Sequence, residues 1–152
     1  MSRFNSRKRG FTLIEILIVV IILGILAAIV IPQFANASKD ARNSNLASTV
    51  QTQRSQIQLY KLQHGDLLPD LETDWTPMTT VTSYGSATNL GPYMQSVPVN
   101  PLVTTAPLTA SIVKEGNGSA AVTGCGFVYD FQSGNGTGRI WGVDDSGNIV
   151  TP

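Results

Sequence analysis

The chain has 152 residues and a formal net charge of zero, because ten basic side chains balance ten acidic ones. This length suits one domain and argues against a multidomain enzyme. The balanced charge lacks the strongly basic signature of a dedicated nucleic-acid binder. The charges are nevertheless unevenly placed, since residues 1–10 carry four bases and no acid, whereas residues 11–152 carry six bases and ten acids. The sequence therefore predicts a basic leader ahead of an acidic body.

A long apolar run follows this leader, from Phe11 to Ile31, and only three of its 21 residues fall outside the apolar set. A helix of this length is about 31 Å long, which matches the hydrocarbon thickness of a bilayer. The run is longer than the apolar region of a secretory signal peptide. We therefore expect a transmembrane helix over residues 11–31. Basic flanks face the cytoplasm, so most of the chain would be exported.

Glu15 interrupts the apolar run and is the first candidate functional residue. A carboxylate at the centre of a bilayer costs about 2.5–3.5 kcal/mol on insertion scales, so an acid within a span suggests a function. The alternative is that Glu15, four residues into the span, extends toward the lipid headgroups.

The residues around Glu15 favour a function, because Gly10-Phe11-Thr12-Leu13-Ile14-Glu15 stands behind a basic leader and ahead of an apolar run. This pattern resembles the processing motif of type IV prepilins and pseudopilins. The resemblance implies that a membrane prepilin peptidase cuts after Gly10, removes the leader 1–10 and N-methylates Phe11. It also implies that Glu15 pairs with the terminal amine of a neighbouring subunit during assembly. A unit-charge pair about 4 Å apart gains roughly 4 kcal/mol at an effective dielectric of 20.

Pro32 ends the apolar run, and family members commonly carry a proline at this point. We expect a kinked helix that continues as an amphipathic segment over residues 32–64, although Pro32 alone could also end an anchor helix. Gly65 provides a helix stop. A helix from residue 11 to 64 would be roughly 80 Å long. Its apolar stripe is predicted to consist of Leu46, Val50, Ile57 and Tyr60.

The rest of the chain is predicted to form an irregular αβ-loop over residues 65–110 and an antiparallel β-sheet over 111–152. Strands are expected at 127–131, 139–143 and 148–151, and Asn117-Gly118 and Asp145-Ser146-Gly147 are typical hairpin turns. The fold class is thus α+β. The resemblance specifies it as the type IV pilin fold, in which one long helix packs on a small sheet.

Three further groups of residues are candidate sites. The glycine-rich run 134–138 lacks the Lys-Ser/Thr of a phosphate-binding loop, and we interpret it as a loop. His64 and Cys125, the single His and Cys of the chain, cannot build a tetrahedral zinc site from these residue types alone. The lone cysteine excludes an intrachain disulfide, which many type IV pilins have. Pseudopilins of the G type commonly hold calcium in a C-terminal loop, and here Asp144, Asp145 and Asn148 offer oxygen ligands, with a solvated turn as the alternative.

These observations predict a structural filament subunit and no enzyme activity. Residues 59–66 and 91–101 resemble segments of G-type major pseudopilins, which favours a type II secretion pseudopilus. The alternatives are a type IV pilus subunit for adhesion, motility or DNA uptake, and an uncleaved membrane anchor that displays a small binding or catalytic domain. Expected partners are further copies of the chain, prepilin peptidase, an inner-membrane assembly platform, minor pilins or pseudopilins and membrane lipid. No nucleic-acid partner and no cofactor other than calcium is expected. The expected location is the bacterial inner membrane, with the N-terminus cytoplasmic and the C-terminal domain periplasmic, and then a periplasmic or surface filament.

Overall fold

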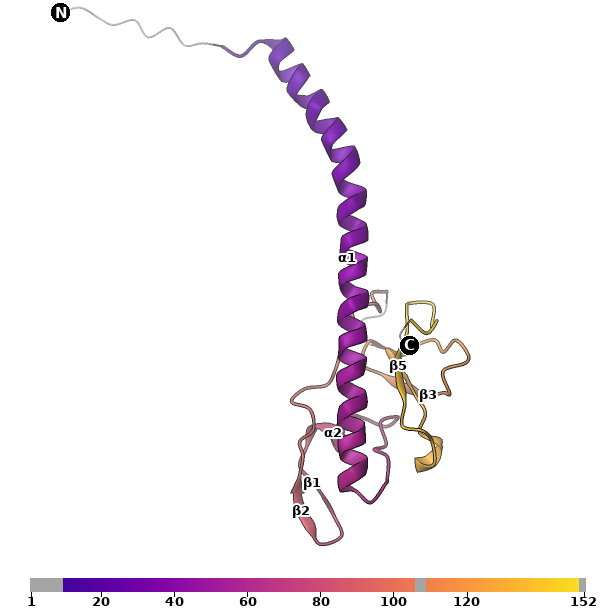
Figure 1. Ribbon diagram of the computed structural model, residues 1–152. Coiled ribbons are helices and arrows are strands. Elements are labelled where there is room, and N and C mark those ends of the chain that lie inside the picture. The colour runs from indigo at the N-terminus through magenta and orange to yellow at the C-terminus, as the bar shows by residue number, and fades with distance from the viewer. Residues whose placement is uncertain (1–9, 106–108, 151–152) are drawn as a thin grey trace, which may run out of the picture. The chain divides into compact units, whose positions relative to one another are not determined.

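The computed structural model describes residues 10–105 and 109–150 (Figure 1). The predicted leader up to Arg9 and the end of the predicted last strand, at Thr151, lie outside these residues. The chain divides into two parts, one up to Lys39 and one from Asp40 onward. All the residues that form a hydrophobic core belong to the second part.

Helix α1 spans Leu13–Gln63 and runs without interruption through Pro32. The residues after Pro32 include many good helix formers and no further proline or glycine before the helix ends. At the end of α1, Gly65 adopts a φ of 61° and the N–H of Asp66 donates to the carbonyl of Lys61 at 2.9 Å. This hydrogen bond is typical of a Schellman motif, and it confirms the predicted helix stop. The alternative in which Pro32 ends the helix is wrong.

The connector after α1, predicted as an irregular αβ-loop, carries three short regular elements among the described residues. It contains the short helix α2 (Thr76–Thr79) and an antiparallel hairpin of β1 (Thr82–Tyr84) and β2 (Ala87–Leu90). Gly85, with a φ of 59°, lies in the turn of this hairpin. These strands are three and four residues long and mostly exposed, so their sequence shows little of the apolar alternation that marks a half-buried strand.

A three-stranded sheet forms the C-terminal part, in the order β3 (Val113–Glu115), β4 (Phe127–Tyr129) and β5 (Ile140–Gly142). Strands β4 and β5 are antiparallel, as predicted, but β3 runs parallel to β4. The Asn117-Gly118 turn therefore lies in a connection between parallel strands, and its assignment to a hairpin is wrong. The second predicted hairpin is present, because Val143 and Ile149 pair antiparallel across the turn at 144–147.

The two faces of this sheet are buried in different clusters. Because side chains alternate along a strand, Phe127 and Tyr129 face the cluster that α1 supplies, whereas Val128 and Trp141 face the opposite one. The first cluster also holds Leu46, Val50, Ile57, Leu68, Leu71, Trp75, Met78, Tyr93, Val113 and Ile140. The second includes Cys125 and Val143. The architecture is α+β and consistent with the type IV pilin fold.

The packing of α1 on the sheet confirms three of the four stripe residues as buried, while Tyr60 is half-buried. Gln53 is polar, but its side chain is fully buried. It lies between Val50 and Ile57 at helical spacing, so the stripe includes it. Helix and sheet approach closely at Gly142, where an added Cβ would lie 2.6 Å from a methyl carbon of Leu46. A glycine is needed at this contact.

Candidate assembly segment and C-terminal turn

Gly10 and Phe11, the residues of the predicted cleavage and methylation site, precede α1 and are exposed. Phe11 is 80% exposed, and no atom lies within 4 Å of a Cβ built at Gly10. The bond between these two residues thus lies in exposed backbone outside the helix. A protease needs such backbone, because a helical peptide bond is occupied by intrahelical hydrogen bonds.

Thr12 and Glu15 together cap the start of α1. The Thr12 N–H and hydroxyl donate to the same Glu15 carboxylate oxygen, Oε2, at 2.8 and 2.7 Å, and the Glu15 N–H donates to the Thr12 hydroxyl oxygen at 3.3 Å. This is a capping box, in which the N-cap and N3 residues satisfy each other's backbone donors. The capping role of Thr12 was missed in the sequence, although Thr-x-x-Glu ahead of an apolar run is its signature.

The capping box leaves part of Glu15 available for another partner. Its Oε1 atom takes no hydrogen bond from the residues that the structure describes. The carboxylate also stands in the first turn of α1, where the positive end of the helix dipole stabilises negative charge. The fold thus supports this charge locally, and one oxygen remains open to a cation from outside the chain.

The apolar run predicted as membrane-spanning forms the first turns of α1, and no other part of the described chain covers it. Its large apolar side chains from Leu13 to Ile31 are 49–85% exposed. The helix contains a window with a mean hydropathy of 3.3, which is long and apolar enough to cross a membrane. Such a surface requires lipid or another protein around it. Pro32 follows directly and lacks the N–H that would bond to the preceding turn.

Of the three predicted calcium ligands, the structure brings Asp144 and Asn148 together in the C-terminal turn. The Oδ1 atom of Asp144 accepts the N–H groups of Ser146 and Asn148, each at 2.9 Å, and the Asn148 amide donates to Oδ2 at 3.2 Å. These bonds to nearby N–H groups are those of an Asx turn. The carboxylate therefore organises the turn between Val143 and Ile149.

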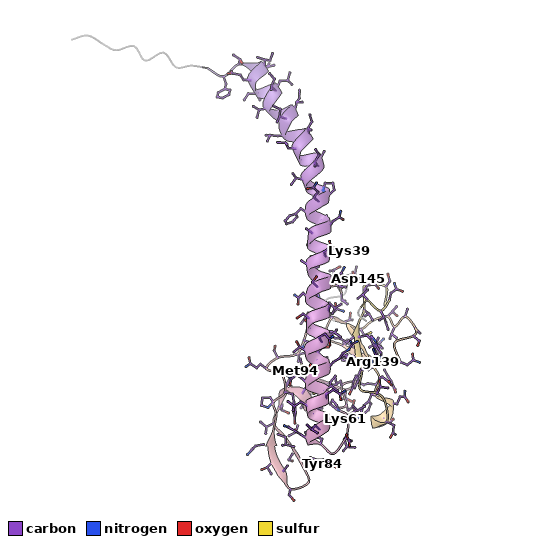
Figure 2. The ribbon with its side chains drawn as sticks, in the orientation of Figure 1. Lys39, Lys61, Tyr84, Met94, Arg139 and Asp145 are labelled. Atoms are coloured by element: carbon purple, nitrogen blue, oxygen red, sulfur yellow. The ribbon has the colours of Figure 1, made fainter. Side chains whose placement is uncertain are left out.

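Asp145, the third residue, points to another segment (Figure 2). Its carboxylate accepts the N–H and hydroxyl of Thr104 at 2.8 and 2.7 Å and those of Thr105 at 3.1 and 2.8 Å. Four hydrogen bonds thus fasten the connector to the C-terminal turn. The hydrogen bonds from Thr104 and Thr105 lower the pKa of Asp145 to about 2, because they favour the charged form.

The four hydrogen bonds to the Asp145 carboxylate predict a stability of the folded chain that depends on pH. The folded pKa of Asp145 lies below its ordinary value of 3.8, so its stabilising contribution is complete above about pH 4 and is lost as the pH falls toward 2. We expect Asp145→Asn to lower the melting temperature of the fragment 40–152 at pH 7, and the difference from wild type to shrink below pH 4. Thermal melts by circular dichroism across this range measure the difference. A difference in melting temperature between wild type and Asp145→Asn that stays constant across this pH range would contradict a stabilising role of these hydrogen bonds.

Calcium binding at Asp144, Asp145 and Asn148 stays a prediction, which thermal melts also test. If the turn binds calcium, we expect added calcium to raise the melting temperature of the fragment 40–152. Calcium at about 100 times its dissociation constant would add about 2.7 kcal/mol to the free energy of unfolding. The control is Asp144→Asn, which should abolish the shift. An unchanged melting temperature would show that the turn holds no structural calcium.

His64 and Cys125 occupy different surroundings. The His64 ring nitrogens bond to the Tyr60 carbonyl oxygen and the Thr82 hydroxyl, both at 3.0 Å. The Cys125 thiol is buried and donates to the Val122 carbonyl oxygen. Burial raises the pKa of the thiol, and the nearby positive charge of Lys114 offsets only part of this rise. A thiol with a raised pKa is a poor nucleophile.

Two residues that hold the connector in place were missed in the sequence. Asn100 is fully buried, and its amide nitrogen donates to the carbonyl oxygens of Gly126 and Val143 at 2.6 and 2.7 Å. The indole N–H of Trp75 donates to the Ser111 carbonyl at 2.7 Å. No local pattern predicts these bonds, because their partners lie 26–43 residues away.

Comparison with known proteins agrees with this arrangement. Residues 5–31 match the family described as the prokaryotic N-terminal methylation motif. The chain is 36% identical over 110 residues to a fimbrial protein of Neisseria meningitidis, covering 72% of this chain and 60% of that protein. It is 37% identical over 83 residues to the prepilin peptidase-dependent protein D of Escherichia coli, covering 54% and 57% of the two chains.

A secretion protein is also among the relatives. The type II secretion system core protein G of Dickeya chrysanthemi is 40% identical over 60 residues, covering 40% of this chain and 39% of that protein. The matches thus span about 60% or less of the length of these relatives. No solved structure matches the chain. Because of its methylation motif, its relatives and its fold, the chain belongs to the type IV pilin and pseudopilin superfamily.

Proposed function

We propose that this chain is a structural subunit of a type IV filament, cut after Gly10 by prepilin peptidase and polymerised through residues 11–31. One observation carries the proposal: the first turns of α1 expose large apolar side chains on all sides and hold a single carboxylate. Before assembly, lipid covers this surface. In a filament, the same segments of neighbouring copies cover each other.

The charge of Glu15 gives this assembly a register. Cleavage creates an amine at Phe11 that the precursor lacks, and the open Oε1 atom of Glu15 can accept it from a neighbouring copy. An unpaired carboxylate in an apolar environment is costly, so a filament that pairs it is favoured over one that does not. The contact is worth roughly 4 kcal/mol at 4 Å and an effective dielectric of 20.

The membrane topology follows from the leader. Its four bases, Arg3, Arg7, Lys8 and Arg9, favour a cytoplasmic N-terminus, which supports the proposal that residues 40–152 lie on the periplasmic side. The inner-membrane assembly platform and the minor pilins or pseudopilins are further proposed partners. A structural rather than catalytic role is supported by the buried Cys125 thiol and by the hydrogen bonds that engage both nitrogens of His64.

The finer function that we propose is a type II secretion pseudopilus. It is supported by the similarity to secretion core protein G and by the single cysteine, which excludes the intrachain disulfide of many pilins. A surface pilus is the second candidate, because the match to the Neisseria fimbrial protein extends over 110 residues rather than 60. Deleting the gene separates the two. Loss of secreted enzymes supports the pseudopilus, whereas loss of surface fibres with normal secretion supports the pilus.

Reconstitution tests the proposal itself. The full chain is expressed in a host that lacks type IV filaments, together with a prepilin peptidase and an assembly platform. We expect fibres in sheared fractions and in negative-stain electron micrographs, and none when the peptidase is omitted. A chain that is cut but never forms fibres with any cognate platform would contradict a filament subunit.

A further inference from the structure

A cavity of about 540 Å³ that is open to solvent lies at the C-terminal end of α1, bordered by the connector and β1. Its lining contains the rings of Tyr60 and His64, the carboxylates of Asp70 and Asp74, and several threonine and serine hydroxyls, but no lysine or arginine. We call it the His64 cavity. All its residues belong to the part of the chain from Asp40 onward, so one compact unit builds the whole site.

The walls of the His64 cavity are fixed in place. The rings of Tyr60 and His64 are stacked with centroids 3.8 Å apart and an interplanar angle of 2°. His64 is 4% exposed, and its Nδ1 donates to the Tyr60 carbonyl oxygen at 3.0 Å. Its Nε2 lies 3.0 Å from the hydroxyl of Thr82, which joins β1 to the helix end. A ligand therefore meets a largely preformed surface.

The chemistry of this lining selects a cation. Asp70 Oδ1 accepts the backbone N–H of Glu72 at 3.1 Å, and Asp74 Oδ1 accepts the backbone N–H of Thr76 at 2.7 Å. Hydrogen bonds from Thr76 lower the pKa of Asp74, so it is ionised at neutral pH. Two carboxylates without a lining base repel anions. A guanidinium suits them, because it offers several donors in a fixed plane and stacks on aromatic rings.

The exposed bases of a second copy supply candidates for this cation. Of the six bases in the described residues, three are engaged within the chain: Arg54 donates to the Ile140 carbonyl at 3.0 Å, Lys114 to that of Thr123 at 2.7 Å, and Arg139 lies 5.5 Å from the Trp141 ring centroid. Lys39, Arg42 and Lys61 have no side-chain partner among the described residues. Lys61 is half-buried beside the cavity at the end of α1 (Figure 2). Arg42 is exposed and carries the guanidinium.

We propose that the His64 cavity receives Arg42 of a second copy, as an axial contact between filament subunits. The inference rests on the proposed filament function, which places many copies of α1 side by side. Arg42 lies 21 residues before the end of α1 at Gln63, which is about 31 Å at 1.5 Å per residue. Two parallel copies displaced axially by about this distance bring the base and the two carboxylates to the same height. A whole-number multiple of the axial rise per subunit in the filament should then be close to about 31 Å.

Charge exchange in the full chain tests this contact. We expect Arg42→Asp and Asp74→Arg each to lower the yield of sheared filaments at least tenfold, and the double variant to restore it to within about threefold of wild type. Asp74→Asn keeps an acceptor for the Thr76 N–H and should also lower the yield, which separates charge from local folding. Glu72→Arg is the matched control, because Glu72 is an exposed acid of the same connector outside the lining.

Each outcome bears on one claim. Normal yields from both single variants, or a double variant no better than the singles although it is cut and melts like wild type, would overturn the Arg42 contact. Wild-type filaments in the same experiment would leave the proposed function standing. If the wild-type chain forms no filaments with a cognate assembly platform, this result would instead contradict the filament function. It would then also contradict the Arg42 contact, which rests on that function.

Discussion

Replacing Glu15 with Gln is expected to abolish filament assembly while leaving membrane insertion, cleavage after Gly10 and methylation of Phe11 intact. Glutamine can still cap the helix, because a capping box accepts Gln at N3, but it carries no charge to pair with a neighbouring amine. Loss of a contact of roughly 4 kcal/mol corresponds to a several-hundredfold loss in the subunit association constant. Quantifying sheared filaments against total processed chain measures the effect.

Thr12→Val is the matched variant for this prediction. It removes the hydroxyl that bonds to Glu15 but keeps the charge, so we expect cut, methylated chain that still assembles. The lost cap costs about 1 kcal/mol of helix stability, which an embedded helix tolerates. The two variants therefore separate the roles of Glu15. Normal filaments from Glu15→Gln, or from Glu15→Leu, would contradict the pairing.

Asn100→Ala is expected to cause the largest loss of stability in the part from Asp40 onward. It removes both donated bonds to the carbonyls of Gly126 and Val143 and the acceptor for the Leu102 N–H. The Gly126 carbonyl keeps the N–H of Val143, so the Val143 carbonyl and the Leu102 N–H are the two groups left without this partner. A buried polar group left without a partner costs about 1–3 kcal/mol, so the total is about 2–6 kcal/mol. A domain of this size is stable by about 5–15 kcal/mol. The variant should therefore be marginally folded.

Urea unfolding of the fragment 40–152 measures this loss, with Asn117→Ala as the control. Asn117 is exposed and accepts only the N–H of Ser119 within its own turn, so we expect a change below about 1 kcal/mol. Equal free energies of unfolding for the two variants would show that the Asn100 bonds do not hold the connector on the sheet.

The features that could be predicted from the sequence depend on residues close together in the chain. The apolar run and the helix formers after Pro32 predicted α1 to within one residue at its C-terminal end, and Gly65 marked its stop. The aromatic and β-branched runs predicted β4 and β5. The candidate processing residues were identified from their spacing, and they lie where that spacing requires, ahead of and within the first turn of α1.

The features that could not be predicted depend on distant partners. Strand β3 is three residues long and pairs parallel to β4, a direction that the length of the connection and not the strand sequence determines. The buried Gln53 is polar in type and buried only because its neighbours on α1 face the sheet. Asp145 has a carboxylate, a common calcium ligand, but its bonds reach Thr104 and Thr105, about 40 residues away. A local pattern describes none of these.

The central claim is that the chain is cut after Gly10 and then enters a filament. Mass spectrometry of the chain from purified filaments tests it most directly. The account predicts an N-terminal peptide that begins with N-methylated Phe11 and lacks all ten leader residues. A chain that retains Met1 or the leader bases in assembled material would contradict it, because Glu15 would then have no terminal amine at Phe11 to pair with.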